Sequence, residues 1–97
     1  MQVAISLCSV NQNDEVLATS FTLTSQGADQ SIESQRAVYA YLHNHNTANA
    51  TVGFTMSGGG HIRLEVAEES LTKEVEAGLY SLATAALQTL GAPIVEG

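Results

Sequence analysis

Hydrophobic and polar residues alternate in two parts of the chain, and this period of two predicts β-strands. The first part holds two alternating segments, residues 2–10 and 15–24, which are separated by the turn-forming residues NQNDE. The second part, residues 50–67, alternates on both sides of three consecutive glycines at positions 58–60. Each part therefore predicts a β-hairpin.

The register of each hairpin follows from the face that must be buried, because a slip of one residue moves every apolar side chain to the other face. A loop of three glycines meets this condition in the second hairpin by pairing Met56 with Ile62, Phe54 with Leu64 and Val52 with Val66. In the first hairpin, Val3, Ile5 and Leu7 must share a face with Leu17, Thr19, Phe21 and Leu23. That condition predicts an odd loop of three or five residues.

Two further segments have apolar residues at helical spacing. Residues 31–45 predict a helix with a moderately apolar stripe, capped by Asp29 or Ser31. Residues 70–90 predict the strongest helix of the chain, capped by Ser70 and ended by Gly91 and Pro93. The tail after Pro93 is open to two interpretations, a short edge strand or a frayed end.

A chain of 97 residues holds one domain, residues 1–97. We predict an α+β fold of order ββαββα, with a four-stranded antiparallel sheet and two helices on its apolar face. Gly78, Ser81 and Ala85 form a ridge of small residues on the second helix. Because glycine inside a helix costs about 1 kcal/mol relative to alanine, we expect another backbone, that of the first helix, to approach this ridge closely.

Acidic residues outnumber basic residues by 10 to 3, which gives a formal net charge of −7. This excess argues against nucleic acid and against anionic membrane surfaces as partners. Charged residues make up only 13% of the chain, so its surface loses little hydration when a partner covers it. No apolar run approaches the roughly 18 residues of a membrane span. The first residues lack the features of a secretory signal, and we expect a cytoplasmic protein.

The sheet face opposite the helices is expected to carry mostly small hydroxyl residues: Ala4, Ser6, Cys8, Ala18, Ser20, Thr22, Thr24, Thr51, Gly53, Thr55, Ser57, His61, Arg63 and Glu65. Such a flat, weakly charged face favours association between sheets. Neutral edge strands without lysine favour association edge to edge. A plain solvated face is the alternative, because antiparallel sheets commonly have one.

The candidate binding residues gather on the second hairpin: Thr55, Ser57, Gly59, His61, Arg63 and Glu65. Arg63 is the natural contact for an anion. The glycine loop joins two strands and lacks a lysine, so it predicts a turn rather than a phosphate site, with Gly59 at an exposed tip. Half of the acidic residues lie between residues 65 and 76. They are open to two interpretations, an acidic patch that docks a basic partner or a solvated helix face.

Other candidates for chemistry carry weaker signals. His43 and His45 point about 200° apart on a regular helix, so we expect neither a metal site nor a cofactor. A dyad of Cys8 with His61 lacks an orienting third group. The single cysteine excludes a disulfide framework.

We therefore predict a non-enzymatic, homo-oligomeric protein-interaction module that inhibits or regulates a protein partner. This function is suggested by analogy with small acidic proteins of phages and mobile elements that inhibit host proteins. The analogy rests on size and charge and not on a shared fold. The first alternative is an oligomer that binds a small anionic ligand around His61 and Arg63. The second is an enzyme that uses His61 with Cys8 or Glu65.

Overall fold

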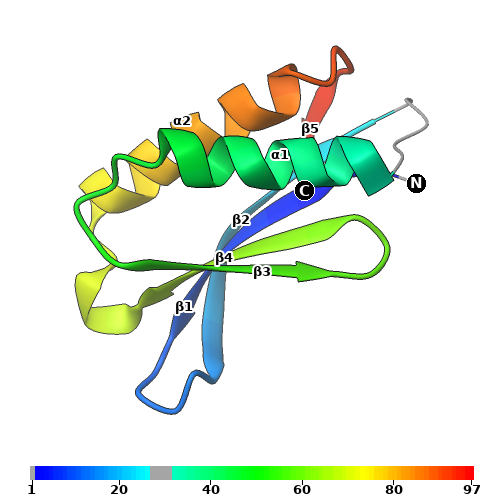
Figure 1. Cartoon of the computed structure of the whole chain (residues 1–97). Helices are drawn as coiled ribbons and strands as arrows, with labels where there is room; N and C mark the ends of the chain where they lie inside the picture. The colour runs from blue at the N-terminus through cyan, green and yellow to red at the C-terminus, as the bar shows by residue number, and fades with distance from the viewer. Residues whose placement is uncertain (1, 27–31) are drawn as a thin grey trace.

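The protein has two layers, a twisted sheet and a pair of helices that cover one of its faces (Figure 1). The computed structural model describes residues 2–26 and 32–97. Along the chain the elements are β1 (Ala4–Val10), β2 (Val16–Ser25), α1 (Ile32–His45), β3 (Val52–Ser57), β4 (His61–Ala67), the short 3₁₀ helix η1 (Glu68–Ser70), α2 (Lys73–Gln88) and β5 (Ile94–Glu96).

The α+β class with two helices is confirmed, but the predicted order ββαββα lacks the strand that follows α2, and the prediction of a four-stranded antiparallel sheet is wrong. The sheet is mixed and has five strands in the order β3-β4-β1-β2-β5. β1 and β4 pair in parallel, whereas all other neighbours are antiparallel. The direction of the chain reverses at every strand and helix, so β1 and β4, separated by three elements, run the same way. Of the two interpretations of the tail, the structure bears out the edge strand, β5.

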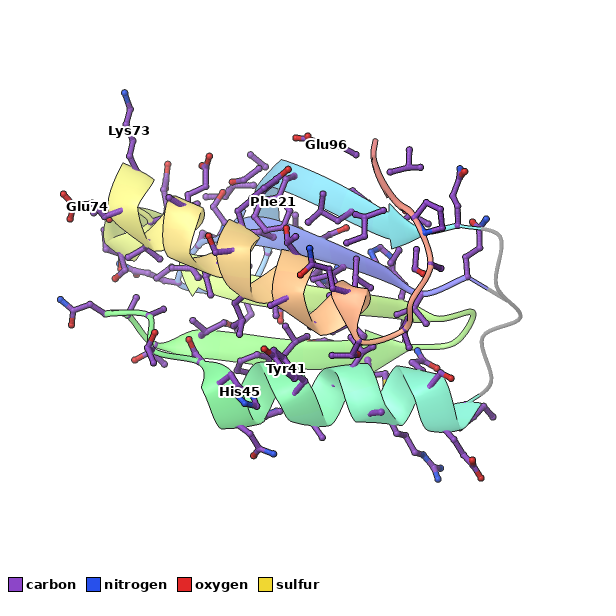
Figure 2. The ribbon with its side chains drawn as sticks, turned by 90° about the horizontal axis from the view of Figure 1, so that it is seen from above. Phe21, Tyr41, His45, Lys73, Glu74 and Glu96 are labelled. Carbon is purple, nitrogen blue, oxygen red and sulfur yellow. The ribbon has the colours of Figure 1, made fainter. Side chains whose placement is uncertain are left out.

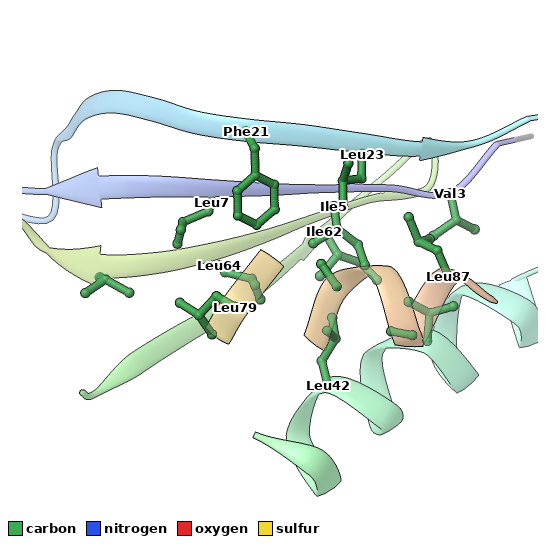
Figure 3. Packing of buried hydrophobic residues seen from close by; sticks show 14 of the residues in the cluster. Val3, Ile5, Leu7, Phe21, Leu23, Leu42, Ile62, Leu64, Leu79 and Leu87 are labelled. Carbon is green, nitrogen blue, oxygen red and sulfur yellow. The ribbon is translucent and has the colours of Figure 1, made fainter. Parts of the chain in front are cut away.

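The two most apolar strands occupy the interior of the sheet. No surface is exposed on Val3, Ile5 and Leu7 at β1, and none on their neighbours in β4, Ile62 and Leu64. Their side chains point from the sheet toward Leu42 of α1 and Leu79 and Leu87 of α2 (Figure 3). β3 and the first half of β2 are largely exposed, and they lie toward the two edges of the sheet. Burial of apolar surface thus explains why β1 and β4 pair with each other.

The register predicted for the second hairpin is confirmed in all three apolar pairs. Gly59 and Gly60 adopt positive φ angles of 79° and 83°, which glycine tolerates without steric cost. The first hairpin has a loop of five residues, 11–15, one of the two lengths predicted.

Two irregularities in β2 overturn part of the predicted face assignment. The pairing with β1 shifts after Leu7 and again after Ser9, and each time β2 contains one extra residue. Thr19 consequently pairs with Cys8 and joins the open face, whereas Ala18 pairs with Ser9 and leaves that face. A strict period of two cannot show such bulges, because each of them inverts the alternation beyond it.

The helices match their predicted ranges, with changes at the ends. α2 starts later than predicted, and its N-cap is Thr72 rather than Ser70; the Thr72 hydroxyl accepts a hydrogen bond from the Val75 amide at 3.1 Å. Ser70 lies in η1 instead. The caps expected for α1, Asp29 and Ser31, lie outside the described residues. Ile32 was expected in the apolar stripe of α1 but is 60% exposed.

The prediction that the backbone of α1 approaches Gly78 is wrong. Gly78 is exposed, and a Cβ atom built on it has no heavy atom within 4 Å beyond its own surroundings in the helix. We therefore expect Gly78→Ala to raise the free energy of unfolding by about 0.5–1 kcal/mol, because alanine restricts the unfolded chain and favours the helix. Urea denaturation followed by circular dichroism measures the change.

Gly59→Ala is the control for Gly78→Ala. A Cβ on Gly59 also has free space, but its φ of 79° strains any L-residue, so we expect a loss of about 1 kcal/mol. A Gly78→Ala variant that is less stable than the wild type would contradict the placement of this residue in solvent.

Candidate functional site

The candidate site is the sheet face that α1 and α2 leave open, since both helices lie on the opposite side of the sheet (Figure 1). Its central strand, β1, presents short side chains that are buried or half-buried between those of its neighbours, as Ser6 and Cys8, each 3% exposed, illustrate. The outer rows on β3 and β4 are more exposed. The face is made of Ala4, Ser6, Cys8, Thr19, Thr22, Thr24, Gly53, Thr55, Ser57, His61, Arg63 and Glu65.

A chain of hydrogen bonds crosses three strands of this face. Nε2 of His61 on β4 lies 2.8 Å from the hydroxyl of Ser6 on β1, and that hydroxyl lies 2.9 Å from the hydroxyl of Thr22 on β2. Parallel pairing of β1 with β4 brings Ser6 next to the His61 ring. The polar groups at the centre of the face thus satisfy one another rather than depending on water.

The only described ion pair lies beside this chain. Nε of Arg63 is 3.2 Å from Oε2 of Glu65, although the two atoms are not aligned for a hydrogen bond. Oε1 of the same carboxylate accepts a hydrogen bond from the Thr55 hydroxyl at 3.0 Å. The positive and negative charges of the face are adjacent, so its formal charge is zero when His61 is neutral.

The structure brings the predicted binding residues together in two groups. Thr55, Arg63 and Glu65 form the ion-pair group, and Ser57 contacts His61 at the hairpin end, where its hydroxyl donates to the His61 carbonyl at 3.2 Å. Gly59 lies at the exposed tip of the glycine loop. No hydrogen bond in the described part of the chain links the tip to either group.

The structure keeps Cys8 and His61 apart, in line with the absence of an expected dyad. Cys8 is level with Glu65 in the sheet, four residues from the level of His61, which corresponds to about 13 Å along a strand. The thiol of Cys8 lies instead 3.6 Å from the hydroxyl of Thr19. His61 and Glu65 are also four residues apart on one strand, so the structure brings together neither of the two pairs considered for an enzyme.

The other two histidines make separate aromatic contacts. His43 packs against Phe54 and Tyr39, with ring centroids 4.1 Å and 4.7 Å away, whereas His45 stacks on Tyr41 at 4.0 Å. Within residues 2–26 and 32–97, no group of three or more His, Cys, Asp or Glu residues is arranged to hold a metal ion.

Sequence reasoning missed the roles of Ser6, Thr19 and Thr22. Ser6 and Thr22 are expected on the open face, and the hydrogen bond between them follows from the pairing of β1 with β2, but the bond from Ser6 to His61 depends on the pairing of β1 with β4. Those two strands are more than 50 residues apart, and no local signal specifies their pairing. Strict alternation places Thr19 on the helix side of the sheet. The bulge that moves Thr19 to the open face has no marker in the sequence.

α1 covers the edge of the sheet that β3 forms. Along β3, side chains of α1 reach the backbone: Gln35 donates a hydrogen bond to the Ser57 carbonyl at 3.2 Å, and Tyr39 to the Phe54 carbonyl at 3.4 Å. Figure 2 shows α1 running along the outer side of β3. The other edge strand is the short β5, which pairs only with the end of β2, and the earlier part of β2 carries the two bulges. Covering helices and bulges are two ways in which proteins prevent edge pairing, and the open face remains the larger uncovered part of the sheet.

Comparisons with protein families, curated proteins and solved structures find no match to this chain. None of the helices in the described ranges combines the length and the apolar character needed to cross a membrane.

Proposed function

We propose that this protein is a non-enzymatic interaction module whose docking surface is the open sheet face and whose occupant is a second copy of the same chain. The observation that carries the proposal is the chemistry of this face: short side chains, internally satisfied hydroxyl groups and a single compensated ion pair. A partner covers such a surface at a small cost in lost hydration.

The distribution of charge favours a second copy on this face. The chain carries a net charge of −7, and two copies repel each other wherever their carboxylates meet. Glu65 on the open face is neutralised by Arg63, and Asp14 of the β1–β2 turn lines a hollow at one end of that face with Gly53 and Glu65. The other described carboxylates lie on the helices, in the β1–β2 turn and on β5: Glu15, Glu33, Glu68, Glu69, Glu74, Glu76 and Glu96. Contact between two open faces keeps most of these charges apart, and a two-fold axis makes the same residues meet in both copies.

The size of the face predicts a weak dimer. Four strands about 4.8 Å apart and about 20 Å long give a flat area of roughly 400 Å² per copy. Two copies together then bury about 800–1,000 Å², which is below the ~1,200 Å² at which stable interfaces begin. We expect a dissociation constant in the micromolar to millimolar range.

The alternative function, binding of a small anion around His61 and Arg63, has weaker support. The carboxylate of Glu65 already lies beside the Arg63 guanidinium, and His61 bonds to Ser6. An anion would have to compete with Glu65 in an acidic protein. Regulation or inhibition of a further protein by the dimer, and a cytoplasmic location, stay predictions.

Sedimentation equilibrium tests the proposal directly. Between about 10 µM and about 1 mM, a range that brackets such a dissociation constant, the mean mass of the protein should rise reversibly toward twice the monomer mass. A mass of 10.2 kDa at every concentration in this range would overturn the proposal.

A further inference from the structure

A hollow lies on the helix side of the sheet, between α2 and the short edge strand β5. It measures about 420 Å³, which is within the usual size of small-molecule sites. Tyr80, Thr84 and Gln88 follow one another at intervals of four residues and form its helical wall. The rest of the lining is Leu23, Ala92, Ile94 and Glu96.

Two contacts hold the ring of Tyr80 at this hollow. The ring packs edge to face against Phe21, with the centroids 5.3 Å apart, and the hydroxyl donates a hydrogen bond to Oε2 of Glu96 at 3.3 Å. The negative charge of Glu96 raises the pKa of Tyr80 above its ordinary value of 10.0, and partial desolvation and the hydrogen bond act in the same direction. Tyr80 therefore stays protonated at neutral pH, and Glu96 is the one charged group in the lining.

We propose that this hollow binds a small organic amine, a monocation with an apolar body. The ammonium group would pair with the Glu96 carboxylate and lie near the Tyr80 ring, whose face attracts cations. The apolar body would cover the half-buried Ala92 and Ile94, with the buried Leu23 beneath them. Thr84 and Gln88 supply hydrogen-bonding groups at the mouth. The same carboxylate repels anions, so the charge of the site selects for the amine.

The probe is 2-phenylethylamine, with 2-phenylethanol and phenylacetate as its neutral and anionic counterparts of similar shape. A ligand of about nine heavy atoms in an open site is expected to bind in the millimolar range. We titrate each compound to about 20 mM into ¹⁵N-labelled protein and follow the amide shifts. The amine should shift the amides of Tyr80, Thr84 and Gln88, and the alcohol and the carboxylate should bind at least about tenfold more weakly.

Glu96→Gln keeps the shape of the side chain and removes its charge, so it should weaken binding of the amine at least about tenfold. Glu74→Gln is the matched control, because Glu74 is exposed at the start of α2, away from Glu96 (Figure 2). The unchanged remainder of the amide spectrum shows that both variants fold.

Three results would overturn the proposal: no shift with the amine, shifts of equal strength with the alcohol, or unchanged affinity in Glu96→Gln. The outcome does not depend on self-association, because the hollow lies on the helix side of the sheet and the dimer would form through the opposite face.

Discussion

Replacement of Leu64 by alanine is expected to lower the free energy of unfolding by about 2–5 kcal/mol. Leu64 has no exposed surface, and its strand neighbours are Leu7 in β1 and Phe54 in β3. Loss of the side chain removes buried apolar surface and leaves a cavity under the helices that the rigid sheet cannot fill. Because small domains are stable by only about 5–15 kcal/mol, this loss is a large part of the total.

Leu17→Ala is the matched control for Leu64→Ala, since it removes the same atoms from a side chain that is 47% exposed on β2. We expect it to change the free energy of unfolding by less than about 1 kcal/mol. Urea denaturation of the two variants, with the slopes compared to exclude a change in the denatured state, measures both values. Equal losses in the two variants would contradict the assignment of β4 to the interior of the sheet.

Arg63→Glu is expected to weaken self-association by a factor of at least about 10, which corresponds to about 1.4 kcal/mol. The substitution changes the formal charge of the open face from zero to −2 in each copy, so two like-charged faces must meet. Its effect on folding should be small, because a partly exposed ion pair contributes only about 0–1 kcal/mol. Sedimentation equilibrium measures the association, and circular dichroism checks the fold.

The control for Arg63→Glu is Arg36→Glu, which makes the same change in net charge at an exposed position of α1 on the other side of the sheet. Arg36→Glu should leave the dissociation constant within about threefold of the wild-type value. This comparison is made at a salt concentration that screens the general repulsion between the two more acidic chains. Equal weakening by both variants would mean that net charge, and not the open face, controls association.

Local patterns were sufficient to predict the hairpins and the helices. The glycine loop and the apolar residues around it determine the register of the second hairpin, because only one pairing buries Phe54 and Leu64 on the same face. The start of α2 was predicted to within two residues, because the hydroxyl of Thr72 caps the helix in place of the predicted Ser70.

The pairing of β1 with β4 could not be predicted in the same way, because it depends on which strands compete best for the interior of the sheet. The hydrogen bonds of Ser6 and His61 depend on this pairing, so the candidate site was predicted as a set of residues but not as a network. The cover of α1 over the β3 edge could not be predicted for the same reason, since the contact of Tyr39 with the β3 backbone depends on how the two elements pack.

The central claim, that two copies meet through their open faces, is tested most directly by the methyl NMR spectrum of the protein as a function of concentration. Between about 50 µM and about 1 mM, the methyl signals of Thr22 and Thr55 on the open face should shift together, while those of Leu79 and Leu87 under the helices stay fixed. Shifts confined to residues of α1 or α2, or no shifts at any concentration, would contradict the claim.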